Sequence, residues 1–463
     1  MRTLLRSLLL ILSVVLALVA SACSGDEDAA PPKVRGDWHG NIEFPGHALA
    51  VGVNFTDDGK ATIDIPEQNV ASMALTEVST DPERVTFAMA DTPGDPKFEG
   101  RYDRDSDTLR GDFTQFGQTV PLNMSRGPAE GPARPQEPKP PFPYRSEEVS
   151  FPSGDITIAG TLTLPSGSGP FPTVVLITGS GPQDRDETLM GHKPFLLLAD
   201  TLTRAGYAVL RTDDRGVGGT GGGPLDDATY ADLTGDVEAG LTFLRTRSDI
   251  DDTRIGLLGH SEGGYLAPPV AARPESGVAF TILIAGPAVP GADVLLEQNR
   301  LIMAAQGATP EEISEQIDFL TGLIDIVRTG DLAAAREYLV QHNSGLPEGQ
   351  RLPDASIENM TSPYMAALLN YDPAAALSAL RVPTLAVYGG KDLQVPPAQS
   401  ADRMRELLSD NPDGTVHVFD GLNHLMQPAD KGSPDEYAGI ETTMDPVVLD
   451  YITAWLTQRF PPR

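Results

Sequence analysis

A serine between glycines carries the strongest chemical signal in the sequence. Gly259-His260-Ser261-Glu262-Gly263 has the form G-x-S-x-G, and it joins an apolar segment, residues 254–259, to a segment with a helical pattern. The flanking glycines allow a sharp turn from strand to helix, so the serine side chain projects above a sheet beside free helix N–H groups. We therefore predict Ser261 as a nucleophile.

A serine hydroxyl is a weak nucleophile near neutral pH, so it needs a base that an acid holds in place. In this strand–turn–helix arrangement the acid and then the histidine follow the serine along the chain. His417 and His424 are the histidines downstream of the candidate acids. His417 lies inside an expected strand, residues 415–419, and is interpreted as a strand residue. His424 lies in the loop that follows, and we predict it as the base.

The candidate acid lies in a glycine-started loop. Gly389-Gly390-Lys391-Asp392 follows an expected buried strand, residues 384–388. Since the carboxyl ends of parallel strands meet at one edge of a sheet, this loop can approach the histidine. We predict Asp392 as the orienting acid, with Asp420 as the alternative.

A tetrahedral oxyanion needs two N–H donors aimed at it. The N–H of Glu262, the residue after the nucleophile, is one expected donor. The second is expected from Gly179-Ser180-Gly181-Pro182, which follows a continuous apolar run at residues 173–178. We select the Ser180 N–H, with Gly181 as the alternative.

The elements around these residues alternate between strand and helix patterns from residue 144 to residue 463, with a helix expected over residues 189–204, for example. This alternation predicts an α/β fold with a mostly parallel, doubly wound sheet. Residues 288–372 interrupt the series with helical sequence only. Such an insertion is either a cap over the active site or a passive elaboration, and we favour a helical cap.

The region before the α/β part has a different pattern. Residues 36–126 form short alternating segments with turn residues between them, which predicts a small all-β barrel or sandwich domain. Residues 127–143 contain seven prolines in seventeen positions, so we expect an extended, semi-rigid linker. No ligand of the β-domain is suggested by its residues.

The amino-terminal segment has the pattern of an export signal. Residues 1–22 combine two arginines, a short apolar run and a small-residue end, and the single cysteine, Cys23, follows directly. This placement resembles a bacterial lipobox, which implies lipidation of Cys23 and a membrane anchor behind an acidic tether, residues 23–35. Plain secretion is the alternative. A lone cysteine excludes an internal disulfide and cysteine-based zinc sites, and a net charge of −31 disfavours nucleic acid as a partner.

Three further patterns are set aside. Residues 216–221 satisfy G-x-G-x-x-G, but the next helical pattern begins only near Tyr230, so a dinucleotide site is not supported. His192 fits the mouth of the pocket or simple packing equally well. The acidic run at residues 249–252 lacks a glycine-turned ligand loop and is interpreted as a solvated turn.

Together, these pieces resemble the α/β-hydrolases, in their bacterial carboxylesterase and serine-aminopeptidase-like branch. The resemblance extends from about residue 147 to residue 460. It rests on Thr178-Gly179-Ser180-Gly181-Pro182-Gln183-Asp184-Arg185-Asp186, on Arg211-Thr212-Asp213-Asp214-Arg215-Gly216, on the Ser261 turn, on the Asp392 loop and on His424. Many relatives carry histidine at the position of Thr178.

The resemblance implies a serine hydrolase that acts on carboxylic esters, some thioesters or amides. The expected activity is that of a carboxylesterase with a small ester substrate, an acyl-enzyme intermediate and a Ser261-Asp392-His424 triad. No cofactor and no metal are expected. The alternatives are a peptidase, amidase or thioesterase on the same triad, and a surface binding protein with an inactive hydrolase domain.

Overall fold

The computed structural model describes residues 34–44, 47–65, 70–90, 92, 94–115, 117–128, 133–346 and 351–462. The expected signal peptide, Cys23 and nearly all of the expected tether lie outside these residues. Within them, no helix combines the length and the apolar character needed to cross a membrane.

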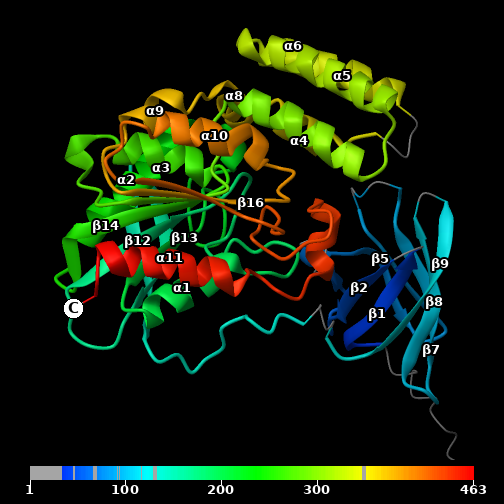
Figure 1. Cartoon of the computed structure of the whole chain (residues 1–463). Helices are drawn as coiled ribbons and strands as arrows, with labels where there is room; N and C mark the ends of the chain where they lie inside the picture. Colours follow the sequence, from blue (N-terminus) through cyan, green and yellow to red (C-terminus); the bar gives the residue numbers. More distant parts are fainter. Residues whose placement is uncertain are drawn as a thin grey trace, which may run out of the picture.

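The amino-terminal domain is one antiparallel sheet, with the order β4-β3-β2-β1-β9-β8-β7-β6-β5 among the described strands. Each described strand pairs with the next along the chain except β4 with β5, which are the two ends of the sheet, and β9 pairs back onto β1, so the sheet curves around one core (Figure 1). Alternate side chains such as Trp38, Phe55 and Phe87 fill that core, which explains the period-2 pattern of the sequence. The expected all-β domain is confirmed. The strands are β1 (Gly36–Phe44), β2 (His47–Phe55), β3 (Ala61–Ile65), β4 (Val70–Ala74), β5 (Thr76–Asp81), β6 (Arg84–Ala88), β7 (Lys97–Asp103), β8 (Thr108–Gln115) and β9 (Gln118–Arg126).

The described end of the linker, from residue 133 onward, lies against the second domain. The Arg134 guanidinium donates hydrogen bonds to the main-chain oxygens of Met190, Ala438 and Ile440, at 2.8 to 2.9 Å. The side chain of Gln136 bonds to the main chain of residues 443–444. This part of the linker is therefore fastened to the second domain, a feature that its proline content does not predict.

The second domain is built on a sheet with the order β10-β11-β13-β12-β14-β15-β16-β17. β10 and β11 form an antiparallel hairpin. The strands that follow in the sheet, β13, β12, β14, β15, β16 and β17, run parallel to one another. Two apolar cores cover the two faces: α1 and α11 pack on one face, and α2, α3 and α10 pack on the other (Figure 1). This is the predicted doubly wound α/β fold. The strands are β10 (Arg145–Ser153), β11 (Ile156–Leu164), β12 (Phe171–Ile177), β13 (Ala208–Thr212), β14 (Ile250–His260), β15 (Thr281–Ile284), β16 (Thr384–Gly389) and β17 (Gly414–Phe419).

Local signals set the starts of several of these helices. A capping box between Thr229 and Asp232 begins α2. Proline occupies the first position of α1, and this helix begins at Pro194 rather than at the predicted residue 189, because residues 189–192 form a tight bridge. The helices of this sandwich are α1 (Pro194–Arg204), α2 (Tyr230–Arg245), α3 (Gly263–Ala271), α9 (Ala374–Ala379), α10 (Pro397–Leu407) and α11 (Pro446–Arg459).

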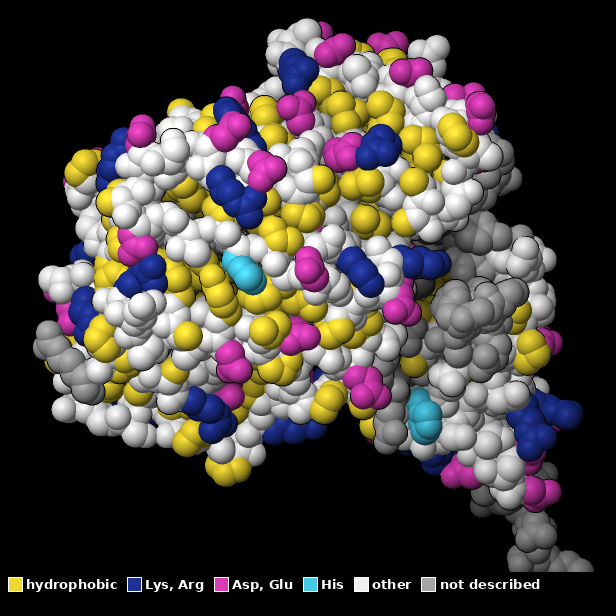
Figure 2. Space-filling model, viewed as in Figure 1, with side chains coloured by type: hydrophobic (Ala, Val, Ile, Leu, Met, Phe, Trp, Pro, Cys, Tyr) yellow, Lys and Arg dark blue, Asp and Glu magenta, His cyan; other side chains and the backbone are white. Residues whose placement is uncertain are grey.

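The insertion between β15 and β16 is helical, and α4, α5 and α6 lie together on one side of the sandwich (Figure 1). It has a small core of its own, which includes Leu323, Ile324 and Ala335. Over the face seen in Figure 2, acidic and basic side chains are interspersed, so the negative charge is spread rather than gathered there. The helices of the insertion are α4 (Gly291–Ala305), α5 (Pro310–Arg328), α6 (Leu332–Gly345), α7 (Asp354–Met360) and α8 (Pro363–Asn370).

Candidate active site

Ser261 lies in the sharp turn between β14 and α3. Its φ of +51° is in the left-handed region, which residues other than glycine rarely adopt. Its N–H donates a hydrogen bond to Ile284 O at 2.9 Å. A Cβ on Gly259 would lie 2.1 Å from Gly263 O, and one on Gly263 would lie 2.3 Å from Ile177 O. Only glycines fit on the two sides of the turn, so the G-x-S-x-G spacing has a direct steric cause.

The predicted base and acid are in contact. His424 Nδ1 lies 2.8 Å from Asp392 Oδ2, and both side chains are buried. The other carboxylate oxygen of Asp392 accepts the N–H groups of Gln394 and Val395, each at 2.8 Å. A carboxylate held in this way fixes the ring with its proton on Nδ1, which leaves Nε2 to take a proton from a nucleophile.

The alternatives weighed for these roles lie elsewhere. His417 stacks on Tyr451, at 4.7 Å between ring centroids, from its place within β17. Asp420 is exposed in the turn after that strand. By contrast, the ring of His424 lies 4.9 Å from that of His260, which directly precedes Ser261. The structure therefore brings the loops of Ser261, Asp392 and His424 to one edge of the sheet.

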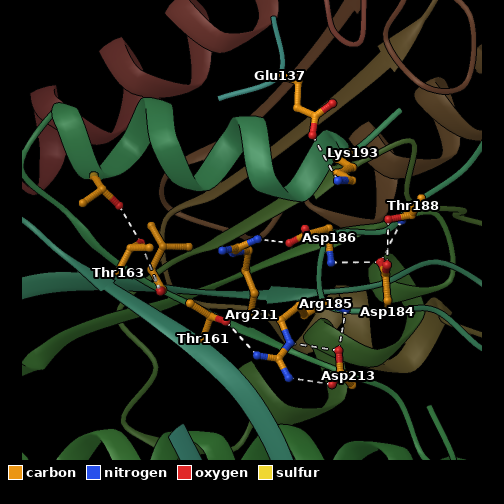
Figure 3. A network of polar contacts seen from close by, with 12 residues as sticks. Glu137, Thr161, Thr163, Asp184, Arg185, Asp186, Thr188, Lys193, Arg211 and Asp213 are labelled. Carbon is orange, nitrogen blue, oxygen red and sulfur yellow. Dashed lines mark hydrogen bonds and ion pairs between the residues drawn. The ribbon is translucent and has the colours of Figure 1, made fainter. Parts of the chain in front are cut away.

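The two motifs that carry the family resemblance bind each other. Arg185 makes a two-pronged ion pair with Asp213, with distances of 3.0 and 2.7 Å, and Asp186 pairs with Arg211 (Figure 3). Asp184 accepts hydrogen bonds from Thr188, which closes the turn between them. The loop that follows β12 is thus held firmly against the end of β13.

Thr178 and Asp214 continue this contact under the expected oxyanion loop. The Thr178 hydroxyl donates to Asp214 Oδ1 at 2.8 Å, and Gln183 N donates to Oδ2 at 2.9 Å. Burial raises the pKa of Asp214 to about 8, although these hydrogen bonds favour the charged form. The hydroxyl of Thr178 therefore anchors the loop to a buried carboxyl group.

Glu187 and Tyr364 are two site residues that the sequence reasoning missed. Glu187 Oε1 accepts Gly179 N at 2.7 Å and lies 2.9 Å from His260 Nδ1. The Tyr364 hydroxyl, on α8 of the insertion, donates to the Glu262 carboxylate and accepts Gly181 N at 3.0 Å. Burial raises the pKa of Glu262. Glu187 directly follows the quoted 178–186 motif, whereas nothing near Tyr364 in the sequence signals its role.

A cavity of about 310 Å³ opens beside Ser261, between the edge of the sheet and the insertion. Ser180, Gly181 and Glu262 line its floor, and Leu295 and Leu368 line it from α4 and α8. None of the described residues that line it is a lysine, arginine or histidine. The helical insertion therefore covers the site, as expected of a cap.

The features that were set aside have ordinary surroundings. His192 is fully buried and bonds to Thr443 and Tyr437 O, away from the cavity lining. Residues 216–221 are a loop, and α2 begins at Tyr230. The interpretation of residues 249–252 as a solvated turn is wrong: Asp249 pairs with Arg247, residues 250–252 begin β14, and Asp251 is buried. Among the residues that the structure describes, no group of three or more His, Cys, Asp or Glu could hold a metal ion.

Comparisons with known proteins agree with this architecture. A model of the alpha/beta hydrolase family matches residues 174–440. Esterase EstD of Thermotoga maritima is 31% identical over 325 residues, which cover 68% of this chain and 70% of that protein. The uncharacterised protein YfhR of Escherichia coli K12 is 28% identical over 173 residues, or 34% of this chain and 57% of that protein.

Solved structures give weaker matches. A Pyrococcus furiosus esterase aligns with a TM-score of 0.44 at 14% identity, over 71% of this chain and 98% of that one. Proline iminopeptidase of Mycobacterium smegmatis aligns with a TM-score of 0.41 at 18% identity, over 68% and 98%. Because the family model matches more than half of this chain, and because the chain is similar to EstD, the chain belongs to the alpha/beta hydrolase family.

Proposed function

We propose that this protein is a serine hydrolase that cleaves carboxylic esters through an acyl-enzyme. The observation that carries the proposal is the hydrogen bond of 2.8 Å between His424 and Asp392, at the edge of the sheet where Ser261 occupies a strained turn. The similarity to an esterase over 325 residues supports esters as the substrate class.

In the first half of the reaction, Ser261 Oγ attacks the ester carbonyl carbon while His424 Nε2 takes the hydroxyl proton. Asp392 holds the ring and stabilises the imidazolium that forms. The N–H groups of Ser180 and Glu262 bind the tetrahedral oxyanion. Collapse of this intermediate expels the alcohol, which takes its proton from His424 and leaves an acyl group on Ser261.

In the second half, water attacks the acyl carbon as His424 takes its proton. His424 then returns that proton to Ser261 Oγ as the bond between the serine and the acyl group breaks. Gly181 N already donates to the Tyr364 hydroxyl, which favours Ser180 N as the donor from the loop. The cavity of about 310 Å³ lies at the low end of the ~300–1,000 Å³ range of ligand pockets, so compact acyl groups fit best.

The test is a panel of nitrophenyl esters of increasing acyl length, with thioester and aminoacyl-amide substrates beside them. We expect the highest kcat/KM for short acyl esters and background rates for Ser261→Ala. Full turnover of a short ester by Ser261→Ala would overturn the proposal. A preference for the amide or thioester substrates would reassign the substrate class on the same triad.

We also propose that the mature chain begins at a lipidated Cys23 and is held at a membrane, by the lipobox-like end of residues 1–22. A single acyl chain binds membranes weakly, so the anchor needs the several chains of a lipoprotein. On expression of the full chain in a bacterial host, the wild-type protein should partition into detergent and Cys23→Ser should not. Equal partitioning of the two into water would indicate plain secretion.

A further inference from the structure

A buried pair of ionisable side chains, Glu187 and His260, lies under the nucleophile and has no part in the steps above. Glu187 comes from the loop after β12 and is 4% exposed, while His260 ends β14 and is 7% exposed. Burying ionisable side chains costs free energy that pairing often only partly recovers. Packing alone therefore does not explain why this pair is buried here.

Both ring nitrogens of His260 face hydrogen-bond acceptors. Nδ1 lies 2.9 Å from Glu187 Oε1, and Nε2 lies 3.2 Å from the main-chain oxygen of His424. A neutral imidazole has one N–H and one lone pair, so in that form one nitrogen would meet an oxygen lone pair. A ring that is protonated on both nitrogens donates to both oxygens.

The groups around His260 favour this charged form. Burial lowers the pKa of His260, but the charge and hydrogen bond of Glu187, the oxygen of His424 and the charge of Asp392 raise it further, so the net shift is upward. The ionisable groups facing the ring are thus Glu187, His424 and, beyond it, Asp392. The remaining neighbours that line a tiny cavity beside it are apolar: Pro194, Phe195, Leu198, Ile284, Leu425 and Met444.

We propose that His260 is an imidazolium throughout the working pH range, held by Glu187, and that it positions and tunes the base His424. It donates a hydrogen bond to the His424 main chain, and its positive charge, 4.9 Å away between ring centroids, opposes protonation of the His424 ring. Glu187 also holds Gly179 N, so the same carboxylate couples the base to the oxyanion loop. This inference rests on the proposed function in taking His424 as the base.

The proposed charge of His260 opposes the effect of the buried carboxylate partner on the base His424. Asp392 alone would favour the imidazolium form of His424, which cannot accept the Ser261 proton. The positive charge of His260, 4.9 Å away between ring centroids, offsets part of that effect. His260 and Glu187 are therefore positioning residues, and neither touches the reacting atoms.

The direct test is NMR of the whole protein labelled with ¹⁵N at histidine, which occurs seven times in the sequence. The signals of His260 are assigned by their loss in His260→Gln. We expect both of its ring nitrogens to be protonated from pH 6 to pH 9. A neutral His260 at pH 7.5, or an ordinary titration near pH 6.5, would overturn the proposal. This readout needs no turnover, so it is independent of whether the ester assignment holds.

The functional test is the pH profile of kcat/KM for Glu187→Gln. Glutamine can still accept Gly179 N, but it removes the negative charge, so His260 should become neutral. The acid limb of the profile, which reports His424 in the free enzyme, should then move up by about one pH unit. The matched control is Asp184→Asn, which alters the same loop without contacting His260. Its profile should keep the wild-type midpoint.

The two measurements separate the parts of the inference. A shifted acid limb in Glu187→Gln together with an unshifted one in Asp184→Asn supports electrostatic tuning by the pair. Equal shifts in both variants would show that loop disorder is the cause and would overturn the tuning. An unshifted limb in Glu187→Gln, in protein whose His260 has become neutral, would also overturn it.

Discussion

The two domains bury different kinds of side chain. Among the described residues before the linker, Thr80 is the one buried polar side chain, and the core is apolar. Ion pairs in that domain are exposed, as for Arg84 with Glu99, and such pairs contribute little to stability. The hydrolase domain buries many ionisable side chains: Glu187, His192, Arg211, Asp213, Asp251, His260, Glu262, Asp392 and His424.

This difference indicates that the buried side chains of the β-domain stabilise its fold, whereas those of the hydrolase domain also serve its proposed chemistry. A buried charge is tolerated only when partners compensate it, so a cluster of them marks a site whose protonation states matter. The nine in the hydrolase domain include the proposed acid and base and their neighbours. Substitutions in the hydrolase site should therefore change rates, whereas core substitutions in the β-domain should change stability alone.

The largest effect is expected for Asp392→Asn. Asparagine keeps the shape of the side chain but favours the wrong tautomer of His424, so we expect kcat for a short ester to fall by about 10⁴-fold. Thermal unfolding of the variant, followed by circular dichroism, controls for misfolding. A loss of less than tenfold in a folded variant would contradict the role of Asp392.

The next effect is on stability, for Trp38→Ala in the β-domain. Removing a fully buried tryptophan leaves a cavity, so we expect the β-domain to lose about 3–5 kcal/mol of unfolding free energy. The change lies in a separate core, so kcat should stay at the wild-type value. Unfolding by urea and ester kinetics on the same sample check both. A parallel fall in kcat would show that the two domains are coupled.

A smaller effect is expected for Tyr364→Phe in the cap. The change removes the hydroxyl that hydrogen-bonds to Gly181 N and to the buried Glu262 carboxyl group. Leaving these two groups without that partner costs about 1–3 kcal/mol, so we expect kcat to fall by roughly tenfold. The matched control is Tyr338→Phe, whose hydroxyl bonds to Phe319 O within the cap. Equal losses in the two variants would assign the effect to cap stability.

A pH dependence of stability is expected to change in Asp214→Asn. The pKa of Asp214 is raised from 3.8 to about 8, so the folded state keeps a proton that the unfolded chain loses near pH 4. Asp214 therefore makes stability fall as pH rises from about 4 to about 8, and no further above that. An asparagine side chain cannot titrate in this range, so the variant should lose this decline.

The measurement for this prediction is Tm between pH 5 and pH 8 for the wild type, Asp214→Asn and the exposed control Asp420→Asn. The control should follow the wild type. A decline of the same slope in Asp214→Asn would show that another group is responsible.

The parts of this picture that depend on local spacing could be predicted from the sequence. The strand alternation predicts the doubly wound sheet, and the position of each loop after a strand was enough to select Asp392 and His424, which hydrogen-bond in the structure. The starts of helices could be predicted less well from the sequence. The apolar pattern from residue 189 continues into α1, but the chain first makes a tight bridge at residues 189–192.

Contacts between distant residues could not be predicted in this way. His260 lies 73 positions from Glu187, Tyr364 lies 102 positions from Glu262, and Arg134 of the linker lies 304 positions from Ala438. No periodicity connects such pairs, because they meet only once the sheet has placed the ends of its strands side by side. The residues that tune and brace the site therefore became visible only in the folded chain.

Covalent labelling tests most directly whether Ser261 is an activated nucleophile. Folded protein is treated with an active-site fluorophosphonate, and the modified peptide is identified by mass spectrometry. We expect one label per chain, on Ser261, and its loss in His424→Ala. Failure of the folded wild-type protein to label Ser261 would contradict the account and would favour a binding protein with an inactive hydrolase domain.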